Sequence, residues 1–365
     1  ITLADGSGGL ESNYMLPDLN VTNAAATITA KALTASLSDQ TKVYDGLRAT
    51  TIALEDYGLT GFVSGESATI TKTEGAFNDK NVLAATSVTV TLAAGDFSAE
   101  SETVLSNYQL PVSVTNTNST ITRKAVELTL ESLSKVYDGS TSYSIDSVND
   151  YSFAGFVDGE GATLSGATAE FNSKDTWDAN TASLSVSASN YVEDDGTTLS
   201  NYTLSTAAVN AADASYSITP KTVTLATASK VYDGTTDLTG YVAVATGVFG
   251  ESLTFTDAEA SDKNVATTGK FISNIVLEDG TNGDKRNYQL PELNATTAGV
   301  TITEYVLGLT GNRSYDGTTV AAAADLTLAT LGEETLQLTG SGSVSDRHVE
   351  AAKSVDTTGL ALGDG

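Results

Sequence analysis

Apolar and polar side chains alternate residue by residue along many short stretches of this chain. Val and Leu alternate with Glu and Thr over 126–131, and with Thr or Ser over 88–92 and 183–187. A period of two residues is typical of a β-strand with one buried and one solvent-facing side. The 32 glycines, many of them next to Asp, supply turns with positive φ. The pattern therefore predicts an all-β chain.

One stretch is ambiguous between helix and strand. Residues 320–331 are rich in Ala and compatible with a short helix, but the corresponding stretches 51–62 and 142–156 contain Tyr and Gly. Those residues argue against a long helix at this place.

Four short motifs recur along the chain in a fixed order. The first ends in Tyr-Asp-Gly, and its tyrosines are 93, 95 and 83 residues apart: Tyr44, Tyr137, Tyr232 and Tyr315. The second follows 31–37 residues later and centres on a basic residue: Lys80, Lys174, Lys263 and Arg347. The third is an Asn-Tyr pair, with Tyr14, Tyr108, Tyr202 and Tyr288. The fourth is an Ile-Thr pair, with Ile28, Ile121, Ile218 and Ile302. Recurrence at this spacing is the signature of a tandem repeat.

The Ile-Thr motif sets the predicted boundaries. They are a leading part-unit at 1–31, the first, second and third repeats at 32–124, 125–221 and 222–304, and a trailing part-unit at 305–365. The two part-units together have 92 residues, the length of one repeat. The chain begins with Ile1 rather than Met, so we expect it to be a piece of a longer protein.

Each repeat is expected to form a small module of six to eight short strands, sandwich-like or alternatively β-grasp-like. No linker rich in Pro or Gly separates the repeats: Lys31, the last residue of the leading part-unit, is followed directly by Ala32, the first residue of the first repeat. Such short junctions restrict hinge motion, so the predicted architecture is a tandem array of modules of about 90 residues that forms an elongated rod. Contacts between neighbouring modules are expected to add to their stability.

Composition and charge exclude several classes of function. The 365 residues include 46 acidic and 18 basic ones, a net charge of −28, which disfavours nucleic acid or anionic lipid as a partner. The chain has no Cys and one His, so disulfides and Cys-type metal sites are excluded. No apolar run is long enough to span a bilayer as a helix. No nucleophile–base pair or phosphate loop is recognisable, so we expect no enzymatic activity and no cofactor.

The motif residues are interpreted as structural. The tyrosine is expected to pack its ring on the core while Asp-Gly forms a tight turn. These residues are Tyr44, Asp45, Gly46, Tyr137, Asp138, Gly139, Tyr232, Asp233, Gly234, Tyr315, Asp316 and Gly317, with the strand anchors Tyr14, Tyr108, Tyr202 and Tyr288. The alternative is a platform of tyrosines for a glycan. Trp177, the only tryptophan, is expected to anchor a local core, and a platform on which a sugar stacks is the alternative.

The recurring basic residues are expected to pair with carboxylates, and a recurring glutamate is a candidate partner. The basic positions are Lys42, Lys135, Lys230 and Arg313 before the motif tyrosine, and the second-motif residues named above. The candidate glutamates are Glu66, Glu160, Glu251 and either Glu333 or Glu334. An isopeptide bond between Lys and Asn is an alternative, which the change to Arg in the trailing part-unit disfavours because a guanidinium is a poor nucleophile.

Acidic loops before the Asn-Tyr pairs are weak candidates for Ca²⁺ through their carboxylate oxygens. Their residues are Asp5, Asp194, Asp195 and Asp279. None of the loops matches a known calcium motif, so no metal site is predicted with these residues. His348 is expected to be a surface residue.

The motifs together resemble the YDG repeats of bacterial surface proteins. The third repeat carries them as Lys230 to Thr236, Gly250-Glu251, Asp262 to Val265 and Asn287 to Leu290. The trailing part-unit departs from the pattern at Arg313 and at Arg347-His348. The resemblance implies an all-β stalk or fibre in a filamentous-haemagglutinin-like adhesin, exported by two-partner secretion to the bacterial cell surface.

Three expectations on function follow from the resemblance and the repeat. The leading one is a structural spacer in an extracellular adhesin or biofilm-matrix protein that mediates attachment. The second is direct binding of exopolysaccharide or cell-surface glycan by the repeats. The expected partners are also neighbouring repeats, in the same or an adjacent chain, because the two part-units could complete each other by strand addition.

Overall fold

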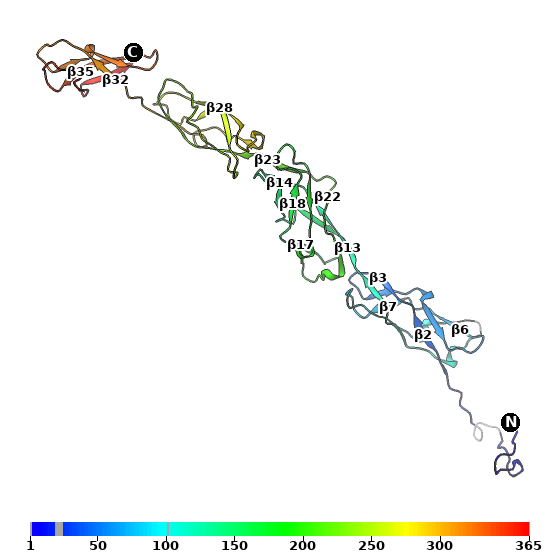
Figure 1. Ribbon diagram of the computed structural model, residues 1–365. Helices are drawn as coiled ribbons and strands as arrows, with labels where there is room; N and C mark the ends of the chain where they lie inside the picture. Colours follow the sequence, from blue (N-terminus) through cyan, green and yellow to red (C-terminus); the bar gives the residue numbers. More distant parts are fainter. Residues whose placement is uncertain (1, 19–24, 101, 365) are drawn as a thin grey trace. The chain divides into compact units, whose positions relative to one another are not determined.

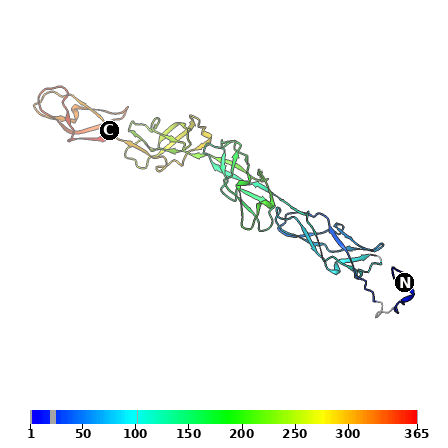
Figure 2. The ribbon, with the colours of Figure 1, turned by 60° about the horizontal axis from the view of Figure 1, so that its bottom comes forward.

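The computed structural model describes residues 2–18, 25–100 and 102–364. Ile1, residues 19–24, residue 101 and Gly365 belong to the predicted leading part-unit, first repeat and trailing part-unit, and lie outside the described residues. Short strands joined by turns make up the described chain (Figures 1 and 2). This confirms the prediction of an all-β chain.

The first repeat, with the residue before it, contains twelve short strands in its described part. They are β1 (Lys31–Ala32), β2 (Thr34–Leu37), β3 (Thr41–Val43), β4 (Ala49–Thr51), β5 (Tyr57–Thr60), β6 (Ser67–Ile70), β7 (Glu74–Phe77), β8 (Val88–Thr91), β9 (Phe97–Glu100), β10 (Tyr108–Gln109), β11 (Ser113–Asn116) and β12 (Thr120–Thr122).

The second and third repeats follow the same order. The second has β13 (Lys124–Leu130), β14 (Leu133–Val136), β15 (Ser142–Ser144), β16 (Tyr151–Ala154), β17 (Ala162–Leu164), β18 (Thr168–Phe171), β19 (Ala182–Leu184), β20 (Tyr191–Glu193), β21 (Tyr202–Leu204), β22 (Val209–Asn210) and β23 (Tyr216–Thr219). The third has β24 (Lys221–Thr222), β25 (Thr224–Leu225), β26 (Ala228–Val231), β27 (Val244–Ala245), β28 (Leu253–Ala260), β29 (Ile272–Asp279), β30 (Tyr288–Gln289) and β31 (Val300–Thr303).

The trailing part-unit has β32 (Gly308–Gly311), β33 (Val320–Ala322), β34 (Leu326–Ala329), β35 (Leu336–Val344), β36 (Val355–Asp356) and β37 (Leu360–Asp364). The ambiguous stretch 320–331 is therefore β33 and β34 with a single turn between them, as its counterparts in the earlier repeats indicated.

Every helical segment in the described residues is a 3-10 turn of three residues. They are η1 (Glu11–Asn13), η2 (Leu54–Asp56), η3 (Ala94–Asp96), η4 (Leu105–Asn107), η5 (Ala188–Asn190), η6 (Leu199–Asn201), η7 (Lys285–Asn287) and η8 (Ala323–Asp325). A β-grasp fold needs an α-helix on its sheet, so these elements fit the sandwich-like alternative. None of the helical segments described could cross a membrane.

The first and second repeats contain more strands than the six to eight expected, whereas the third contains eight. Turns divide what would otherwise be long strands: β6 and β7 are separate in the first repeat, whereas the corresponding β28 is one strand of eight residues. The pairing of β28 with β29 keeps a register shift after Thr256. The interruption that separates β6 from β7 thus corresponds to a β-bulge in β28, where the strand continues.

Antiparallel and parallel pairing are combined in each repeat. In the first, β11, β8, β7 and β4 form an antiparallel sheet, and β2 pairs with β5 and β6 with β9. Two parallel pairs join the ends of the repeat: β1 with β10, and β12 with β3. The second pair places Ile121 opposite Lys42. The Ile-Thr motif is therefore the strand that lies beside the Tyr-Asp-Gly motif.

The hydrophobic core of the first repeat continues into the second. Tyr44, Phe77, Val88 and Ile121 are almost completely buried in one cluster, which also contains Tyr202 from the second repeat. The residue contacts divide the chain into two compact units: unit 1 comprises 1–130, 145–167 and 184–209, and unit 2 comprises 131–144, 168–183 and 210–365. Each part of the second repeat thus groups with a neighbouring repeat, so repeats do not bury their tyrosines alone.

Candidate functional site: tyrosine–glutamate clusters where repeats meet

The Tyr-Asp-Gly motif forms a turn that its own lysine holds closed. In the first repeat, Lys42 Nζ donates to Asp45 Oδ1 at 2.7 Å and to the carbonyl oxygens of Leu47 and Ala49 at 2.8 and 2.7 Å. Asp45 Oδ1 also accepts from the Leu47 N–H at 3.0 Å. Gly46 has a φ of 79°, a conformation that favours glycine. The turn is therefore a local structure encoded within eight residues.

The other motifs repeat this turn. The pairs are Lys135–Asp138 at 2.8 Å, Lys230–Asp233 at 2.8 Å and Arg313–Asp316 at 2.8 Å. Burial acts to raise the pKa of Asp138, but hydrogen bonds from Lys135 and Ser140 outweigh it and lower that pKa. The prediction that these basic residues pair with carboxylates is confirmed, but the partner is the aspartate of the same turn and not the candidate glutamate. The aspartate lies three residues further along in the same turn and forms the ion pair with the lysine there.

The motif tyrosine reaches out of its own repeat to a glutamate of the next one. Tyr44 Oη donates to Glu160 Oε1 at 2.7 Å, across 116 residues of sequence. Tyr202, from the Asn-Tyr motif of the second repeat, donates to Glu160 Oε2 at 2.7 Å. The two rings meet edge to face with centroids 5.3 Å apart, a favourable aromatic geometry. One carboxylate thus holds two buried phenols from adjacent repeats.

The second such cluster joins the second and third repeats. Tyr137 Oη and Tyr288 Oη donate to Glu251 Oε1 and Oε2 at 2.7 and 2.5 Å, and the ring centroids are 5.4 Å apart. Lys174 Nζ adds a hydrogen bond to Tyr137 Oη at 2.9 Å and an ion pair with Glu251 at 3.2 Å. The predicted pairing of the second-motif lysine with a recurring glutamate is therefore present here, and the lysine contacts a phenol and a carboxylate rather than an asparagine amide.

The hydrogen bonds favour protonated phenols in both clusters and an ionised carboxylate at Glu251. Burial, and then the hydrogen bond to Glu160, raise the pKa of Tyr44 to about 12. Burial and Glu251 likewise raise the pKa of Tyr288. Burial alone would raise the pKa of Glu251, but hydrogen bonds from Tyr288, Tyr137 and Lys174 outweigh it, so its pKa lies below 4.5. Such a site donates hydrogen bonds to a fixed anion and is not poised for proton transfer near neutral pH.

The asparagine of the Asn-Tyr motif forms a second link between repeats. Asn287 is 1% exposed; its Oδ1 accepts from the Thr176 N–H at 2.9 Å and its Nδ2 donates to Asp175 at 2.8 Å. Asn201 makes the same two bonds to Val82 and Asn81, both at 2.9 Å. The loop that this asparagine caps therefore belongs to the preceding repeat.

The motif glycine also lies against the neighbouring repeat. A Cβ at Gly139, where φ is 84°, would lie 2.9 Å from Val248 Cγ1. A Cβ at Gly46 would lie 3.2 Å from Val157 Cγ1. Glycine is therefore required twice here, for its backbone conformation and for the close approach of the next repeat.

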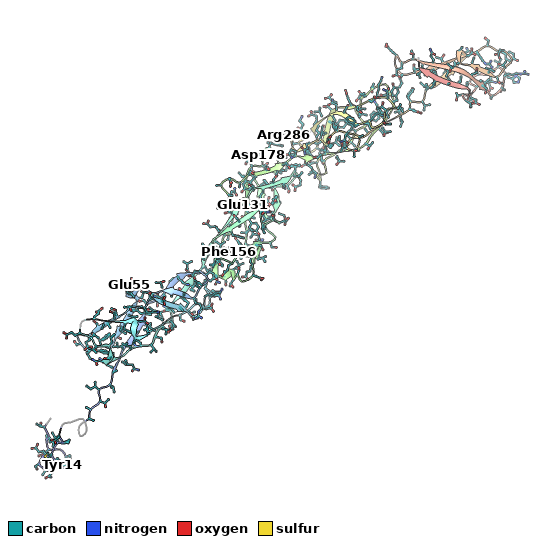
Figure 3. The ribbon with its side chains drawn as sticks, turned by 180° about the vertical axis from the view of Figure 1, so that it is seen from behind. Tyr14, Glu55, Glu131, Phe156, Asp178 and Arg286 are labelled. Carbon is teal, nitrogen blue, oxygen red and sulfur yellow. The ribbon has the colours of Figure 1, made fainter. Side chains whose placement is uncertain are left out.

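Trp177 is not the core anchor that was predicted. Its side chain is 45% exposed, and the guanidinium of Arg286 lies 3.6 Å from its ring centroid. Arg286 and Asp178, the residue that follows Trp177, lie close together in Figure 3. A cation–π contact between two repeats thus covers one face of the ring.

The cluster at the end of the third repeat has one phenol instead of two. Tyr232 Oη donates to Glu334 Oε1 at 2.6 Å, and Lys263 Nζ lies 3.8 Å from the same oxygen. Glu334, rather than Glu333, is thus the recurring glutamate. Two predicted core tyrosines are exposed: Tyr14 at 71% and Tyr315 at 64%. Both belong to part-units, and in the described residues neither tyrosine lies in a paired strand.

The weak Ca²⁺ candidates do not come together. Asp5 Oδ1 accepts from the Glu11 N–H at 2.6 Å, and Asp279 Oδ1 accepts from the Lys285 N–H at 2.9 Å. The Asp194 N–H donates to the Gly161 carbonyl, the Asp194 carbonyl accepts from the Thr197 N–H in the same loop, and Asp195 is exposed. In the described residues no three carboxylate or imidazole side chains gather to hold an ion. His348 is exposed, and its backbone N–H is bonded to Asp346 at 2.8 Å.

Sequence reasoning did not identify the hydrogen-bond partner of the motif tyrosine, which is a glutamate of the next repeat. The glutamates had been identified as recurring, but as partners for lysine. The signal was present: a Val-x-Gly-Glu segment recurs as 63–66, 157–160 and 248–251, and its Val and Glu both contact the preceding motif at the second and third sites.

These features define a tandem array of all-β modules whose repeated motif residues join each module to the next. A family model described as the YDG domain matches residues 29–117, 122–210 and 219–298. The chain therefore belongs to the YDG domain family and contains three tandem YDG repeats, as the motifs indicated. Neither a curated protein nor a solved structure matches it.

Proposed function

We propose that this chain is a structural, non-enzymatic segment of a secreted bacterial adhesin or biofilm-matrix protein. Its repeats act as a spacer that holds a binding region away from the cell surface. The proposal places the chain outside the cell, and attachment between cells or to a surface is the activity that it serves.

One observation carries the proposal: the most recognisable residues of the repeat are used to join repeats. The Tyr44 hydroxyl donates a hydrogen bond to Glu160, 116 residues further along the chain. The Tyr137 hydroxyl donates one to Glu251, 114 residues further along. A ligand-binding motif would keep these side chains free for a partner. Here their hydroxyl groups are occupied and their rings are 2% and 1% exposed.

The physical properties of the chain fit such a role. A polypeptide without Cys folds without oxidation chemistry. A net charge of −28 disfavours self-association through random contacts. Junctions with a buried carboxylate, two phenols and an asparagine resist bending more than a flexible linker does, which suits a spacer.

Glycan binding remains the alternative to a spacer. The exposed tryptophan is the residue that would favour it, because sugars stack on exposed aromatic faces. Arg286 already covers one face of Trp177 at 3.6 Å. A glycan would have to use the other face or displace the guanidinium, which weakens this alternative.

A glycan array probed with the 365-residue chain separates the two functions. The spacer predicts no binding above background. Binding that is lost in Trp177→Ala and kept in Tyr241→Ala, another exposed aromatic residue at 47%, would contradict the spacer and support recognition of a glycan.

Mechanical unfolding tests the spacer itself. Pulling a single chain by its two ends should give stepwise unfolding, with length gains of about 30 nm for each repeat of about 90 residues at roughly 3.5 Å per residue. Extension without resolvable steps would contradict a load-bearing role. Antibody labelling of intact producing cells tests the location, and labelling only after lysis would contradict it.

A further inference from the structure

Parallel strand pairs close each repeat near both of its ends. At the start, the first strand of the repeat lies beside the Asn-Tyr strand: β1 with β10, β13 with β21, and β24 with β30. At the end, the Ile-Thr strand lies beside the strand that leads into the Tyr-Asp-Gly motif, the motif strand: β12 with β3, β23 with β14, and β31 with β26. These are the entry pair and the exit pair of a repeat.

Parallel pairing determines how these strands respond to tension along the chain. In the exit pair, tension pulls the Ile-Thr strand toward its carboxyl end, where the chain leaves the repeat, and pulls the motif strand toward its amino end. In the entry pair, it pulls the first strand toward its amino end and the Asn-Tyr strand toward its carboxyl end. Parallel strands pulled in opposite directions must slide past each other, so their cross-strand hydrogen bonds are loaded together. Parallel strands pulled from the same end would separate one hydrogen bond at a time.

The motif tyrosine lies at the end of each exit pair. Its N–H donates to the carbonyl of the Ile-Thr threonine at 2.8–2.9 Å in all three repeats: Tyr44 to Thr122, Tyr137 to Thr219, and Tyr232 to Thr303. The isoleucine before that threonine is 2–4% exposed: Ile121, Ile218 and Ile302. An Ile-Thr strand therefore cannot slide without also drawing a buried apolar side chain out of the core, which costs free energy.

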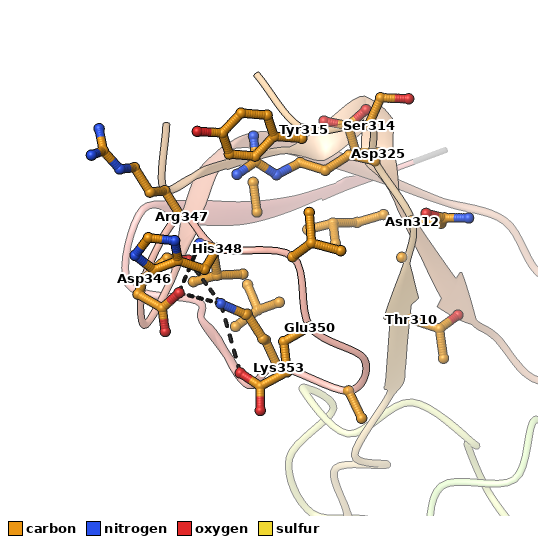
Figure 4. Close-up of a pocket in the computed structure, with 18 of the residues that line it drawn as sticks. Thr310, Asn312, Ser314, Tyr315, Asp325, Asp346, Arg347, His348, Glu350 and Lys353 are labelled. Atoms are coloured by element: carbon orange, nitrogen blue, oxygen red, sulfur yellow. Dashed lines mark hydrogen bonds and ion pairs between the residues drawn. The ribbon is translucent and has the colours of Figure 1, made fainter. Parts of the chain in front are cut away.

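The motif forms its turn without the exit pair, but the tyrosine is not buried by the motif alone. Tyr315, which lines the cavity shown in Figure 4, has no Ile-Thr strand beside it in the described residues, and it is 64% exposed. Tyr44, at the end of an exit pair, is 2% exposed. The same ion pair closes the turn in both motifs. Strand pairing, and not the turn, therefore goes with a fixed position of the tyrosine.

A single residue separates each exit pair from the entry pair of the next repeat. Arg123 lies between β12 and β13, and Pro220 lies between β23 and β24. On the far side of this connecting residue, the new strand begins opposite the tyrosine of an Asn-Tyr motif: Lys124 opposite Tyr202, and Lys221 opposite Tyr288. The connecting residue thus has a motif tyrosine on its exit side and an Asn-Tyr tyrosine on its entry side.

The tyrosine–glutamate cluster bridges that connecting residue. At the first junction, Tyr44 and Tyr202 donate to the two oxygens of Glu160, each at 2.7 Å. Tyr137 and Tyr288 bond to Glu251 in the same way at the second junction. If the Ile-Thr strand slides, the next repeat moves with it, so the hydrogen bond from the motif tyrosine must break as well. The first junction lies within unit 1 and the second within unit 2.

We propose that the exit pair, the tyrosine–glutamate cluster and the entry pair at each of these two junctions form a mechanical clamp that resists tension along the chain. The two parallel pairs hold the strands in shear, and the cluster resists tension beside the connecting residue. The motif tyrosine joins these parts, because its N–H ends the exit pair and its hydroxyl group binds the next repeat. The inference rests on the proposed spacer role, since a spacer between a cell and its attachment site is pulled along its chain.

Pulling one exit pair in two directions tests the clamp in the full chain. The chain has no cysteine, so two introduced cysteines on exposed residues define where single-molecule handles attach. Ser38→Cys with Arg123→Cys loads β3 at its amino end and β12 at its carboxyl end, which is the shear direction. Leu47→Cys with Arg123→Cys loads both strands at their carboxyl ends and peels them apart.

The shear direction should need at least about twice the force of the peeling direction, because forced unfolding follows the rate of the step that is loaded. In both directions a gain in length of about 25–30 nm, at roughly 3.5 Å per residue, identifies the first repeat. The two measurements differ only in the place of one surface cysteine, so the stability of the repeat is matched between them.

A second comparison tests the cluster. Ser38→Cys with Val209→Cys, which is also exposed, extends the loaded segment across the first junction. At constant force, adding Tyr44→Phe should speed rupture of this segment about tenfold, because it removes a hydrogen bond to a charged group. It should leave rupture between residues 38 and 123 almost unchanged. Tyr191→Phe is the matched control: this buried tyrosine donates to the Ser205 carbonyl at 2.7 Å within the second repeat, and its loss should speed rupture across the junction less.

Three outcomes would overturn the clamp. Equal forces in the shear and peeling directions would show that the exit pair is not the element that resists. Equal acceleration by Tyr44→Phe within the repeat and across the junction would show that its hydroxyl group stabilises the repeat but bears no tension, and equal effects of Tyr44→Phe and Tyr191→Phe would show the same. Resolvable steps in the end-to-end pull, together with any of these outcomes, would overturn the clamp alone, whereas the absence of steps would overturn the spacer as well.

Discussion

Replacing Glu251 with alanine should destabilise unit 2 more than the loss of any exposed carboxylate. The side chain is 8% exposed and accepts hydrogen bonds from Tyr288 at 2.5 Å and Tyr137 at 2.7 Å. A hydrogen bond to a charged group contributes about 1.5–3 kcal/mol. Two such bonds, at the low end of that range, amount to about 3 kcal/mol in the free energy of unfolding. Lys174 adds less because its side chain is 41% exposed and regains water.

Urea unfolding followed by tryptophan fluorescence measures this loss. Trp177 is the only tryptophan, and it lies in unit 2 beneath Arg286. With a urea dependence of about 2 kcal/mol per molar, a loss of about 3 kcal/mol lowers the transition midpoint by about 1.5 M. The fluorescence transition should therefore move to clearly lower urea.

Two control variants make the result specific. Glu278→Ala removes an exposed ion pair with Lys285, in which the side chains are 40% and 42% exposed, and should change the free energy by at most about 1 kcal/mol. Glu66→Ala removes the bond from Tyr108 in unit 1 and should leave the tryptophan transition unchanged. If Glu251→Ala and Glu278→Ala shift the midpoint equally, the buried cluster does not stabilise the junction and the reasoning is refuted.

Three further predictions concern the same junctions. Asn287→Ala should cost about 1–3 kcal/mol in urea unfolding because it leaves buried groups unbonded, whereas Asn107→Ala, at the exposed corresponding position of the first repeat, should cost almost nothing; equal losses would contradict the link. Gly139→Ala should lower the melting temperature more than Gly166→Ala. Both glycines have positive φ, but only at Gly139 does the new Cβ approach a neighbouring side chain, at 2.9 Å; the reverse order would contradict the close approach. Because hydrogen bonds from Tyr288, Tyr137 and Lys174 lower the pKa of Glu251 in the folded chain, its contribution is present above the ordinary pKa of a glutamate and is lost as the pH falls through the lower folded value. The difference in urea midpoint between the unmodified chain and Glu251→Gln should shrink from pH 7 to pH 3, and a constant difference would speak against an ionised acceptor.

Much of the fold could be predicted from the sequence because its signals are local. Alternation of side chains over 126–131 predicted the strand that became β13, Lys124–Leu130. The Asp-Gly pair predicted the turn after each motif tyrosine. The recurrence of four motifs predicted the repeat, which the family match confirms. Each of these signals lies within a few residues or depends only on comparing one copy with the next.

The partners of the site residues could not be predicted, because they depend on how one repeat lies against another. The recurring motif predicted that the ring of Tyr44 packs on a core, but not that Glu160 accepts a hydrogen bond from its hydroxyl group. Lys42 was assigned to a distant glutamate although Asp45 stands three residues away in the same turn. Trp177 was assigned to a local core, whereas a guanidinium from the following repeat covers one face of its ring.

The interaction energy between Tyr137 and Glu251 tests the central claim most directly, since their bond crosses from one repeat to the next. A double-mutant cycle with Tyr137→Phe, Glu251→Ala and the double variant isolates this energy from the loss in each single variant. Measured in urea with Trp177 as the probe, it should be about 1–3 kcal/mol. Effects of the two single changes that add up to within about 0.5 kcal/mol would show that the repeats are not coupled through this cluster.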